Sequence, residues 1–278
     1  MMTIIPDTPS SLRLTPISRL AAAGRWRVEA MRALREPVLL WFTQGQGRIT
    51  VAGSTRGYGP NNAVFIPPGT MYGFEMAARV QGSSVFFGRN HGLDLPRTPH
   101  FLRPRDPISQ KELVAILEAI QRELESARSG SQKAAQHHLG LLGVWMDRQL
   151  ERERALETMP QRPAAAQQLV ARYSSLLERD FRSNRAVADY AEALGVTPTH
   201  LTRVCRASCG KSAHQLLDDR LHFEARRLLT ETRMPIKHVA EMLGFNSPGY
   251  FTRAFQKNAG MTPSAFRKKP AGPVVPRA

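Results

Sequence analysis

The stretch that decides the fold runs from Ile236 to Phe255 and reads Ile-Lys-His-Val-Ala-Glu-Met-Leu-Gly-Phe-Asn-Ser-Pro-Gly-Tyr-Phe-Thr-Arg-Ala-Phe. Its first apolar residues recur at helical spacing and predict a short helix that ends at Gly244, because glycine tolerates the positive φ of a helix C-terminus. Ser247 and Pro248 then predict a second helix, with a hydroxyl N-cap and a ring suited to the first helical position. The outward face of this second helix carries Gly249, Thr252, Arg253 and Gln256.

The same pattern occurs a second time, because residues 191–204 repeat residues 240–254 with one residue fewer. Thr197 takes the place of the N-cap and Pro198 starts the second helix. One copy alone would fit a helical hairpin in any α-helical domain. Two copies in tandem favour paired helix-turn-helix units that dock into DNA major grooves. The outward face of the first copy carries Thr199, Thr202, Arg203 and Arg206.

The tandem motifs resemble the DNA-binding domain of AraC/XylS-type transcription regulators. The resemblance rests also on the run Gly-Phe-x-Ser-x-x-Tyr-Phe-x-x-x-Phe from Gly244 and on the closing Gly-x-Thr-Pro-Ser-x-Phe-Arg that ends at Arg267. It implies two recognition helices in successive major grooves, joined by a long helix for which residues 212–230 have a suitable pattern. Cys205 stands where the family usually has a large aromatic residue, which predicts a lighter core in the first motif.

The outward side chains divide into two groups of predicted DNA contacts. A guanidinium pairs bidentately with guanine, and short hydroxyls reach base edges, so one group is assigned to base readout. The other is assigned to phosphates, which set the salt dependence of binding. Thr197 and Ser247 belong to the second group and also cap their helices. The predicted base-reading residues are Thr199, Thr202, Arg203, Thr252 and Arg253; the predicted phosphate-binding residues are Thr197, Arg206, Ser247, Gln256, Lys257, Arg267 and Lys268.

The charge of the chain favours a nucleic-acid partner. Its 278 residues hold 39 Lys and Arg against 23 Asp and Glu, a formal net charge of +16. Residues 161–278 carry 19 basic against 9 acidic side chains (+10), and the first 160 carry 20 against 14 (+6), so the excess is denser beside the tandem motifs. No apolar run of 18 residues occurs and Met1 to Ser10 lacks the pattern of a secretory signal. We therefore expect a cytoplasmic protein with no membrane partner.

The N-terminal part carries a β pattern from about residue 25 to residue 87, and residues 1–20 read as an irregular arm. Short runs of Val, Ile, Phe and Trp predict strands near 26–31, 38–43, 48–52, 63–66, 72–76 and 80–87, with turns at 44–47, 57–60 and 67–70. Many short strands with such turns predict a small antiparallel sandwich or barrel.

The run from Tyr58 to Phe74 resembles the second conserved stretch of cupin barrels, the fold common to the sensor half of this family. That resemblance implies a cupin-like barrel that senses a small-molecule effector. Tyr72 stands where enzymatic cupins place a metal-binding histidine, and no His-x-His pair precedes it, so we expect no metal, no cofactor and no enzyme. Cys205 and Cys209 lie within one helical turn of each other in the first motif. We expect both to be reduced thiols and not metal ligands. The candidate pocket residues, each of which also fits a purely structural role, are Trp41, Arg48, Tyr72 and Phe74.

From Ser109 onward the pattern is helical, with apolar stripes on two consecutive helices over about 109–124 and 131–157. These stripes fit either a dimer interface or packing onto the chain's own barrel. The prediction is an α+β chain of two domains: a cupin-like antiparallel β-barrel with a helical dimerisation element and an all-α tandem helix-turn-helix domain. The boundaries are 1–108 for the barrel and arm, 109–158 for the two helices, 159–163 for a linker, 164–269 for the DNA-binding domain and 270–278 for a disordered tail.

The sequence thus predicts a sequence-specific transcription regulator controlled by a small-molecule effector. Its candidate partners are double-stranded DNA, the effector, a second copy of the chain and RNA polymerase. Two alternatives remain open, a cupin-type enzyme with a DNA-binding tail and an architectural DNA-binding protein without an effector.

Overall fold

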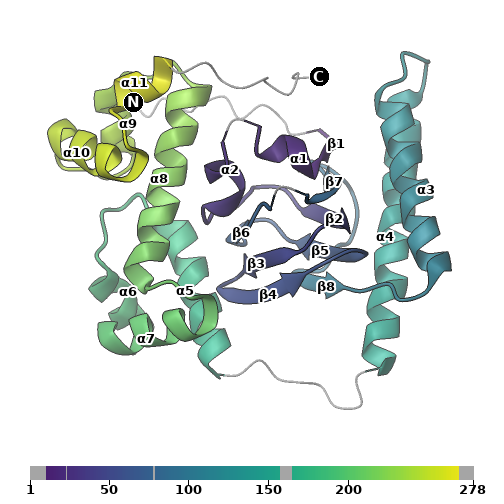
Figure 1. Cartoon of the computed structure of the whole chain (residues 1–278), viewed down its shortest axis with the longest axis horizontal. Helices are drawn as coiled ribbons and strands as arrows, with labels where there is room; N and C mark the ends of the chain where they lie inside the picture. Colours follow the sequence, from purple (N-terminus) through teal and green to yellow (C-terminus); the bar gives the residue numbers. More distant parts are fainter. Residues whose placement is uncertain (1–10, 23, 78, 157–164, 269–278) are drawn as a thin grey trace.

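The computed structural model describes residues 11–22, 24–77, 79–156 and 165–268 (Figure 1). The predicted linker 159–163, the predicted tail 270–278 and the first ten residues of the predicted arm lie outside the described residues. Residues 11–156 are called the N-terminal half below, and residues 165–268 the C-terminal half.

Two antiparallel sheets form the centre of the N-terminal half. One has five strands in the order β1-β7-β2-β5-β8, and the other has three in the order β4-β3-β6. No strand pairing joins the two sheets within the described residues, so they form an open sandwich. The antiparallel β architecture is confirmed, and the closed cupin-like barrel is not found. The strands are β1 (Arg13–Pro16), β2 (Val38–Gln44), β3 (Gly47–Val51), β4 (Ser54–Tyr58), β5 (Asn62–Ile66), β6 (Tyr72–Phe74), β7 (Gln81–Phe86) and β8 (His100–Leu102).

The central strand β2 is covered on both faces, which explains its unbroken run of apolar residues. Val38 and Leu40 pack with the three-stranded sheet, whereas the alternate residues Leu39 and Trp41 pack against two helices on the opposite face. All four side chains are buried. The register therefore places one hydrophobic core on each side of the five-stranded sheet.

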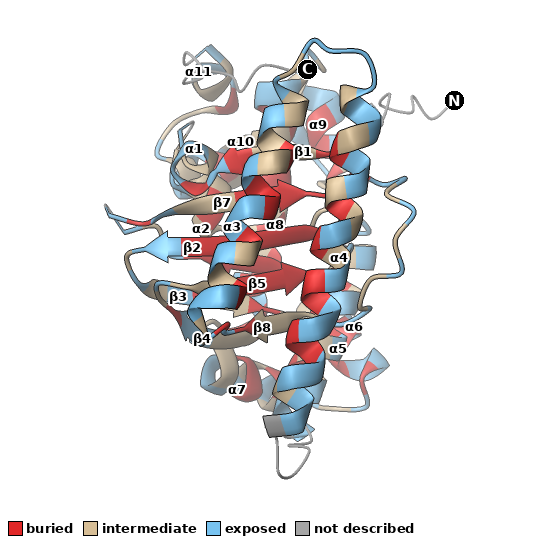
Figure 2. Ribbon diagram, turned by 90° about the vertical axis from the view of Figure 1, so that its right-hand side faces the viewer, coloured by how far each residue is buried: buried red, intermediate tan, exposed pale blue. Residues whose placement is uncertain are grey.

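The two covering helices are α3 (Pro107–Leu124) and α4 (Ser131–Leu156), which lie across the five-stranded sheet (Figure 2). Asp106 caps α3 by accepting a hydrogen bond from Ser109 N at 2.7 Å, and the helix begins two residues earlier than predicted. The Trp145 indole of α4 donates to the carbonyl of Ser109 at 3.0 Å. The predicted apolar stripes face the sheet and belong to its core: Leu113, Ile116, Leu117, Ile120, Ala135, Leu139, Leu142, Met146 and Leu150.

The described C-terminal half is entirely helical, as predicted. Its long helix α8 runs between two smaller groups of helices, with α6 and α7 near one end and α9, α10 and α11 near the other (Figure 1). The helices are α5 (Ala165–Asp180), α6 (Val187–Ala193), α7 (Pro198–Cys209), α8 (Ala213–Glu231), α9 (Ile236–Met242), α10 (Pro248–Ala259) and α11 (Pro263–Lys268).

A buried network of charges ties α8 to α5. Arg220 donates to Glu178 at 2.5 Å and to Glu224 at 3.2 Å. Glu224 also accepts from Arg182 at 2.5 Å and from Arg227 at 2.7 Å. Arg220 is 4% exposed and Glu224 is 2% exposed, so each charge must find its partners inside the protein. The network fixes the middle of α8 against the first helix of its domain.

The two halves of the chain also share an interface built by α2 (Trp26–Glu29). The centre of the Trp26 ring lies 5.7 Å from the centre of the Phe223 ring of α8 and 6.1 Å from that of the Phe266 ring of α11, and both pairs have edge-to-face geometry. Arg27 pairs with Glu231 at 3.5 Å. Aromatic pairs of this geometry contribute about 0.5–1.5 kcal/mol beyond their buried area. The N-terminal half is therefore docked onto the middle and the C-terminal end of α8 and onto α11.

The predicted strand at 26–31 is wrong, because residues 26–29 form α2. Its apolar residues serve two different cores, with Val28 packing on the sheets and Met31 joining the core of the C-terminal half. The predicted arm contains β1 and the short helix α1 (Ile17–Leu20). The predicted turn at 57–60 overlaps β4, and β8 was not predicted. β1, β4 and β8 are edge strands, where one unpaired side and little burial leave a weak sequence pattern.

Glu224→Gln is expected to lower the free energy of unfolding at pH 7 by about 3 kcal/mol, because it removes the anion that three arginines share. Burial raises the pKa of Glu224, but the hydrogen bond from Arg227 and the nearby guanidinium charges outweigh it, so this pKa lies well below its usual range. A carboxyl group whose pKa is lower in the folded state stabilises the protein at pH values above its unfolded-state pKa, which is about 4.3 for Glu. This contribution to the free energy of unfolding decreases as the pH falls below that value.

Urea unfolding at neutral and at acid pH measures this effect. The stability difference between wild type and Glu224→Gln should be smaller near pH 3 than at pH 7. Glu241→Gln is the matched control, since Glu241 is exposed on α9. An equal difference at both pH values would show that the Glu224 charge does not stabilise the fold.

Candidate nucleic-acid interface

Helix α7 is the second helix of the first motif, and its boundaries follow from local chemistry. The Thr197 hydroxyl accepts a hydrogen bond from His200 N at 3.2 Å, and Pro198 occupies the first helical position. Gly210 ends the helix in the left-handed region with φ 71°. The N-cap predicted from the sequence is confirmed, and the structure adds Gly210 as the residue that ends the helix.

Helix α10 repeats this construction in the second motif. The Ser247 hydroxyl accepts from Tyr250 N at 3.1 Å, Pro248 follows it, and Gly260 ends the helix with φ 72°. Each of the two helices has 12 residues. The repeat seen in the sequence is therefore also a repeat of backbone structure.

The two helices bury the expected faces. Leu201, Val204 and Cys205 of α7 are buried, as are Phe251 and Phe255 of α10, and all five belong to one core. Predicted DNA contacts that are exposed comprise Thr197, Thr199, Arg203, Arg206, Ser247, Arg253, Gln256, Lys257 and Lys268; Thr202, Thr252 and Arg267 are half-buried.

On α7, four predicted contacts share one concave surface. A groove of about 430 Å³ is lined by Pro198, Thr199, Thr202, Arg203 and Arg206. The base-reading candidates of α7 thus lie beside a predicted phosphate contact, as a helix inserted in a groove of DNA requires.

The comparisons with known proteins agree with this geometry. Residues 190–269 match a family model described as a helix-turn-helix domain. Over 85 residues the chain is 36% identical to the arabinose operon regulatory protein of Escherichia coli (strain K12), covering 31% of this chain and 29% of that protein. Over 64 residues it is 41% identical to the ornithine utilization regulator of Pseudomonas aeruginosa, covering 23% and 19%. Residues 190–269 form an AraC-type helix-turn-helix domain.

Matches to solved structures span more of the chain at lower similarity. Apo ToxT from Vibrio cholerae shares 13% identity over 93% of this chain and 97% of that chain, with a TM-score of 0.43. The C-terminal domain of the response regulator yesN from Fusobacterium nucleatum shares 23% identity over 38% of this chain and 100% of that chain, with a TM-score of 0.35. Because the chain spans 29% of the length of the arabinose regulators it matches, the sequence relationship concerns the AraC-type domain.

His200 is a residue of the AraC-type domain whose position the sequence analysis did not use. Its ring nitrogen Nδ1 lies 3.0 Å from a terminal nitrogen of Arg203, which donates when that ring nitrogen is unprotonated. His200 and Arg203 are three residues apart, a spacing that places side chains on one helical face. This spacing in the sequence could have indicated that His200 lies beside Arg203. In the second motif the corresponding residue is Tyr250, which is 58% exposed.

Arg267 is held differently from the other predicted phosphate contacts of the AraC-type domain. Its guanidinium donates to the carbonyl of Met234 at 2.6 Å, so it is turned back towards the loop before α9. Lys268, the next residue, is exposed. The structure therefore favours Lys268 over Arg267 as a phosphate contact at the end of the domain.

The four candidate pocket residues are not brought together. Trp41 lies in the core between the five-stranded sheet and α3 and α4, whereas Tyr72 and Phe74 lie in the core between the two sheets. Arg48 is exposed and donates to Glu75 at 3.0 Å. The prediction that they line one cavity is wrong, because strand alternation sends them to different faces.

The described residues contain no group of three or more His, Cys, Asp or Glu side chains placed to hold a metal ion. Cys205 and Cys209 are free thiols, and the Cys209 thiol donates to the carbonyl of Cys205 at 3.2 Å. Burial raises the pKa of Cys205 to about 12, which keeps this thiol protonated at neutral pH. Within the described part of the chain, no helix is both long and apolar enough to span a membrane.

Thr197→Ala and Ser247→Ala are each expected to lower the free energy of unfolding by about 1 kcal/mol, because each removes the acceptor for a helix N-terminal amide. Thr197→Ser and Ser247→Thr keep a hydroxyl at the same place and serve as controls that retain most of the stability. Denaturant unfolding measures the four variants. An alanine variant as stable as its hydroxyl control would contradict the capping role.

Proposed function

We propose that this protein is a sequence-specific transcription regulator that reads double-stranded DNA with α7 and α10. The observation that carries the proposal is the structural repeat of these two helices. Each begins with a hydroxyl cap and proline, each ends at a left-handed glycine, and each exposes one arginine at the same place, Arg203 in α7 and Arg253 in α10.

The spacing of the two helices supports simultaneous binding in successive major grooves. Helix α8 joins the two motifs and has 19 residues, which corresponds to a length of about 28 Å. One turn of DNA is about 34 Å long. In Figure 1, α10 lies to the left of the upper part of α8 and α7 lies at the lower end of α8, where it also contacts β4; α3 and α4 lie on the far side of the sheets from both helices. The buried ion network holds the middle of α8 against α5.

The roles of individual side chains follow from their exposure and chemistry. Arg203 and Arg253 are the first candidates for base readout, with Thr199, Thr202 and Thr252 beside them. Their neighbours Arg206, Gln256, Lys257 and Lys268 are candidates for phosphate contacts. Because duplex DNA is the proposed target, the protein would act in the cytoplasm, where RNA polymerase is a candidate partner and activation one candidate outcome.

The N-terminal half is proposed to sense a small-molecule effector and to form a homodimer. The proposed domain boundaries are those of the sequence analysis, except that the helical element begins with α3 at Pro107. The apolar side chains that remain exposed on α3 and α4 are the candidate dimer surface: Ile108, Val114, Leu141 and Val144. An enzyme of the cupin type remains the alternative that metal analysis of the purified protein would reveal.

Arg253→Ala and Arg203→Ala are each expected to weaken specific DNA binding by about 1–3 kcal/mol and to relax the preference at the contacted base pairs. DNA-site selection followed by binding titration measures both effects. Arg122→Ala removes an equal charge from α3, on the opposite side of the molecule, and should bind as wild type does (Figure 1). Unchanged site selection by both recognition-helix variants would refute the proposal.

Leu141→Glu combined with Val144→Glu is expected to convert a dimer into a monomer, because two charges would lie in an apolar interface. Sedimentation equilibrium measures the mass. Gln132→Glu combined with Gln136→Glu adds the same charges at exposed polar positions of α4 and should remain dimeric. A wild-type protein that is monomeric at high concentration would overturn the assignment of this surface.

A further inference from the structure

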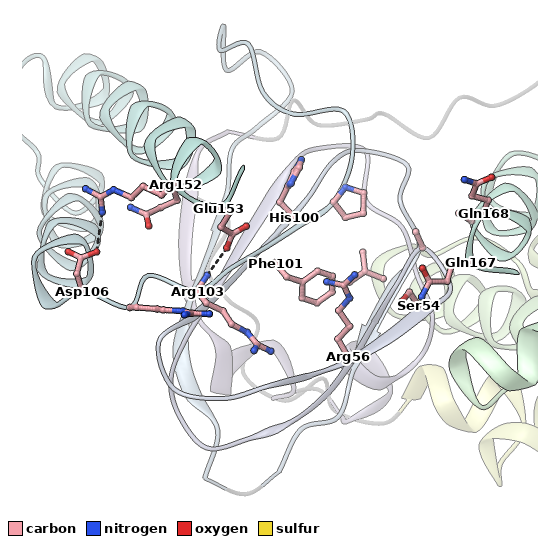
Figure 3. Close-up of a pocket in the computed structure, with 16 residues that line it drawn as sticks. Ser54, Arg56, His100, Phe101, Arg103, Asp106, Arg152, Glu153, Gln167 and Gln168 are labelled. Carbon is pink, nitrogen blue, oxygen red and sulfur yellow. Dashed lines mark hydrogen bonds and ion pairs between the residues drawn. The ribbon is translucent and has the colours of Figure 1, made fainter. Parts of the chain in front are cut away.

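A cavity of about 820 Å³ lies where the N-terminal half meets the first helix of the C-terminal half. None of the proposed DNA contacts and none of the four pocket residues predicted from the sequence lines it. Its walls come from the β3–β4 hairpin, from β8 and the loop after it, from the last third of α4, and from α5 (Figure 3). The α4 residues Arg152 and Glu153 lie on one side of the cavity, and the α5 residues Gln167 and Gln168 on the other.

The charge of the lining is unbalanced. Four arginines contribute to it, namely Arg56, Arg103, Arg105 and Arg152, against the two carboxylates of Asp106 and Glu153. Both carboxylates are already engaged. Asp106 caps α3 and pairs with Arg152 at 3.0 Å, and Glu153 accepts a hydrogen bond from the backbone N–H of Arg103 at 3.1 Å.

Three guanidinium groups therefore remain for a ligand. Within the described residues, no ion pair joins Arg56, Arg103 or Arg105 to a carboxylate. Arg56 is positioned by an aromatic contact, with its guanidinium carbon 4.7 Å from the centre of the Phe101 ring. Figure 3 shows these two side chains lying together on the wall of the cavity. A guanidinium held in this way can present its planar donors to a carboxylate.

The rest of the lining is apolar or carries amides. Phe101, Val51, Pro99 and Ala171 supply apolar surface, and side-chain amides come from Gln149, Gln167 and Gln168. The volume falls within the range of about 300–1,000 Å³ that is usual for small-molecule sites. A bulky apolar body and an anionic head group would both find matching surface in this cavity.

We propose that this cavity binds a small organic carboxylate with an apolar or aromatic body, and that this carboxylate is the effector. The inference rests on the proposed function, which requires an effector site. It adds the chemical class of the effector and the location of its binding site. Arg56 and Arg103 bind the carboxylate, and the apolar side chains bind the body.

The position of the cavity gives the ligand a route to the DNA-binding helices. The β3–β4 turn already touches α5, because Gly53 has φ +74° and a Cβ there would lie 2.0 Å from the Val170 side chain. A ligand that contacts both the sheet and α5 adds interactions across the same junction and favours the docked arrangement of the two halves. Any difference in DNA affinity between docked and undocked arrangements is then transmitted to the operator, and DNA changes ligand affinity by the same factor.

Three probes with the same body test the head group in full-length protein: phenylbutyrate, phenylbutyl phosphate and phenylbutanol. Binding is measured by calorimetry and by the rise in Tm with probe concentration. Phenylbutyrate should bind and raise the Tm, and phenylbutanol should bind about tenfold or more weakly, since it lacks the charge that guanidinium groups recognise. Tighter binding of the phosphate than of the carboxylate would overturn the assignment to carboxylates.

Matched variants locate the site. Arg56→Gln combined with Arg103→Gln should weaken phenylbutyrate binding by about tenfold or more. Arg148→Gln combined with Arg122→Gln removes the same charge from exposed positions of α4 and α3 outside the cavity and should bind the probe as wild type does. Equal binding by the two double variants, or no binding of phenylbutyrate to wild type, would overturn the proposal.

DNA binding without the probe separates this proposal from the proposed function. The Arg56→Gln, Arg103→Gln variant should retain sequence-specific DNA binding, because α7 and α10 are unchanged. In wild type, phenylbutyrate should shift the apparent Kd for DNA, and in this variant it should not. A probe that binds the cavity without changing the DNA affinity would overturn its role as the effector. If the wild-type protein shows no sequence-specific DNA binding, with or without phenylbutyrate, the proposed function itself is refuted.

Discussion

The ion network of Arg220, Glu178 and Glu224 is the constraint on which the rest of the C-terminal half depends. Removing both charges of a pair from water is costly, and the cost is offset only when each charge has several well-placed partners. Here Glu224 accepts from three arginines, and Arg220 donates to two carboxylates, all with α8 as the common element. The network holds the middle of α8 against the C-terminal part of α5. The separation of α7 and α10 follows from the length of α8, which has 19 residues and lies between the two motifs.

The junction between the two halves extends this rigidity into the N-terminal half. Trp26 lies between Phe223 and Phe266, and therefore contacts both the long helix and the last helix of the AraC-type domain. Met31 and Met71 from the N-terminal half belong to the same hydrophobic core as α7 and α10. A change in the sheets can thus reach the recognition helices through packed side chains. The arginine-lined cavity lies along a second part of this junction, where the β3–β4 turn meets α5.

Prediction from the sequence succeeded where one short segment holds all the necessary signals. The caps Thr197 and Ser247, the prolines after them and the glycines Gly210 and Gly260 specify both recognition helices without help from distant residues. It failed where burial depends on partners far along the chain. Trp26 belongs to a short helix because its ring packs on Phe223 and Phe266, and a strand pattern could not reveal those partners. Trp41 and Tyr72 were grouped as one pocket, although strand alternation sends them to separate cores.

The sequence by itself determined that the chain ends in a tandem helix-turn-helix domain, and it determined which faces of α7 and α10 are polar. These features follow from helical periodicity and capping, which act over a few residues. Only the tertiary structure decided that the two sheets stay open, that α3 and α4 cover the five-stranded sheet, and that four arginines from three separate segments line one cavity. Those outcomes depend on contacts between residues far apart in the chain, such as Arg56 with Phe101 and Gly53 with Val170. Local patterns contain no record of such contacts, because only the folded chain brings their partners together.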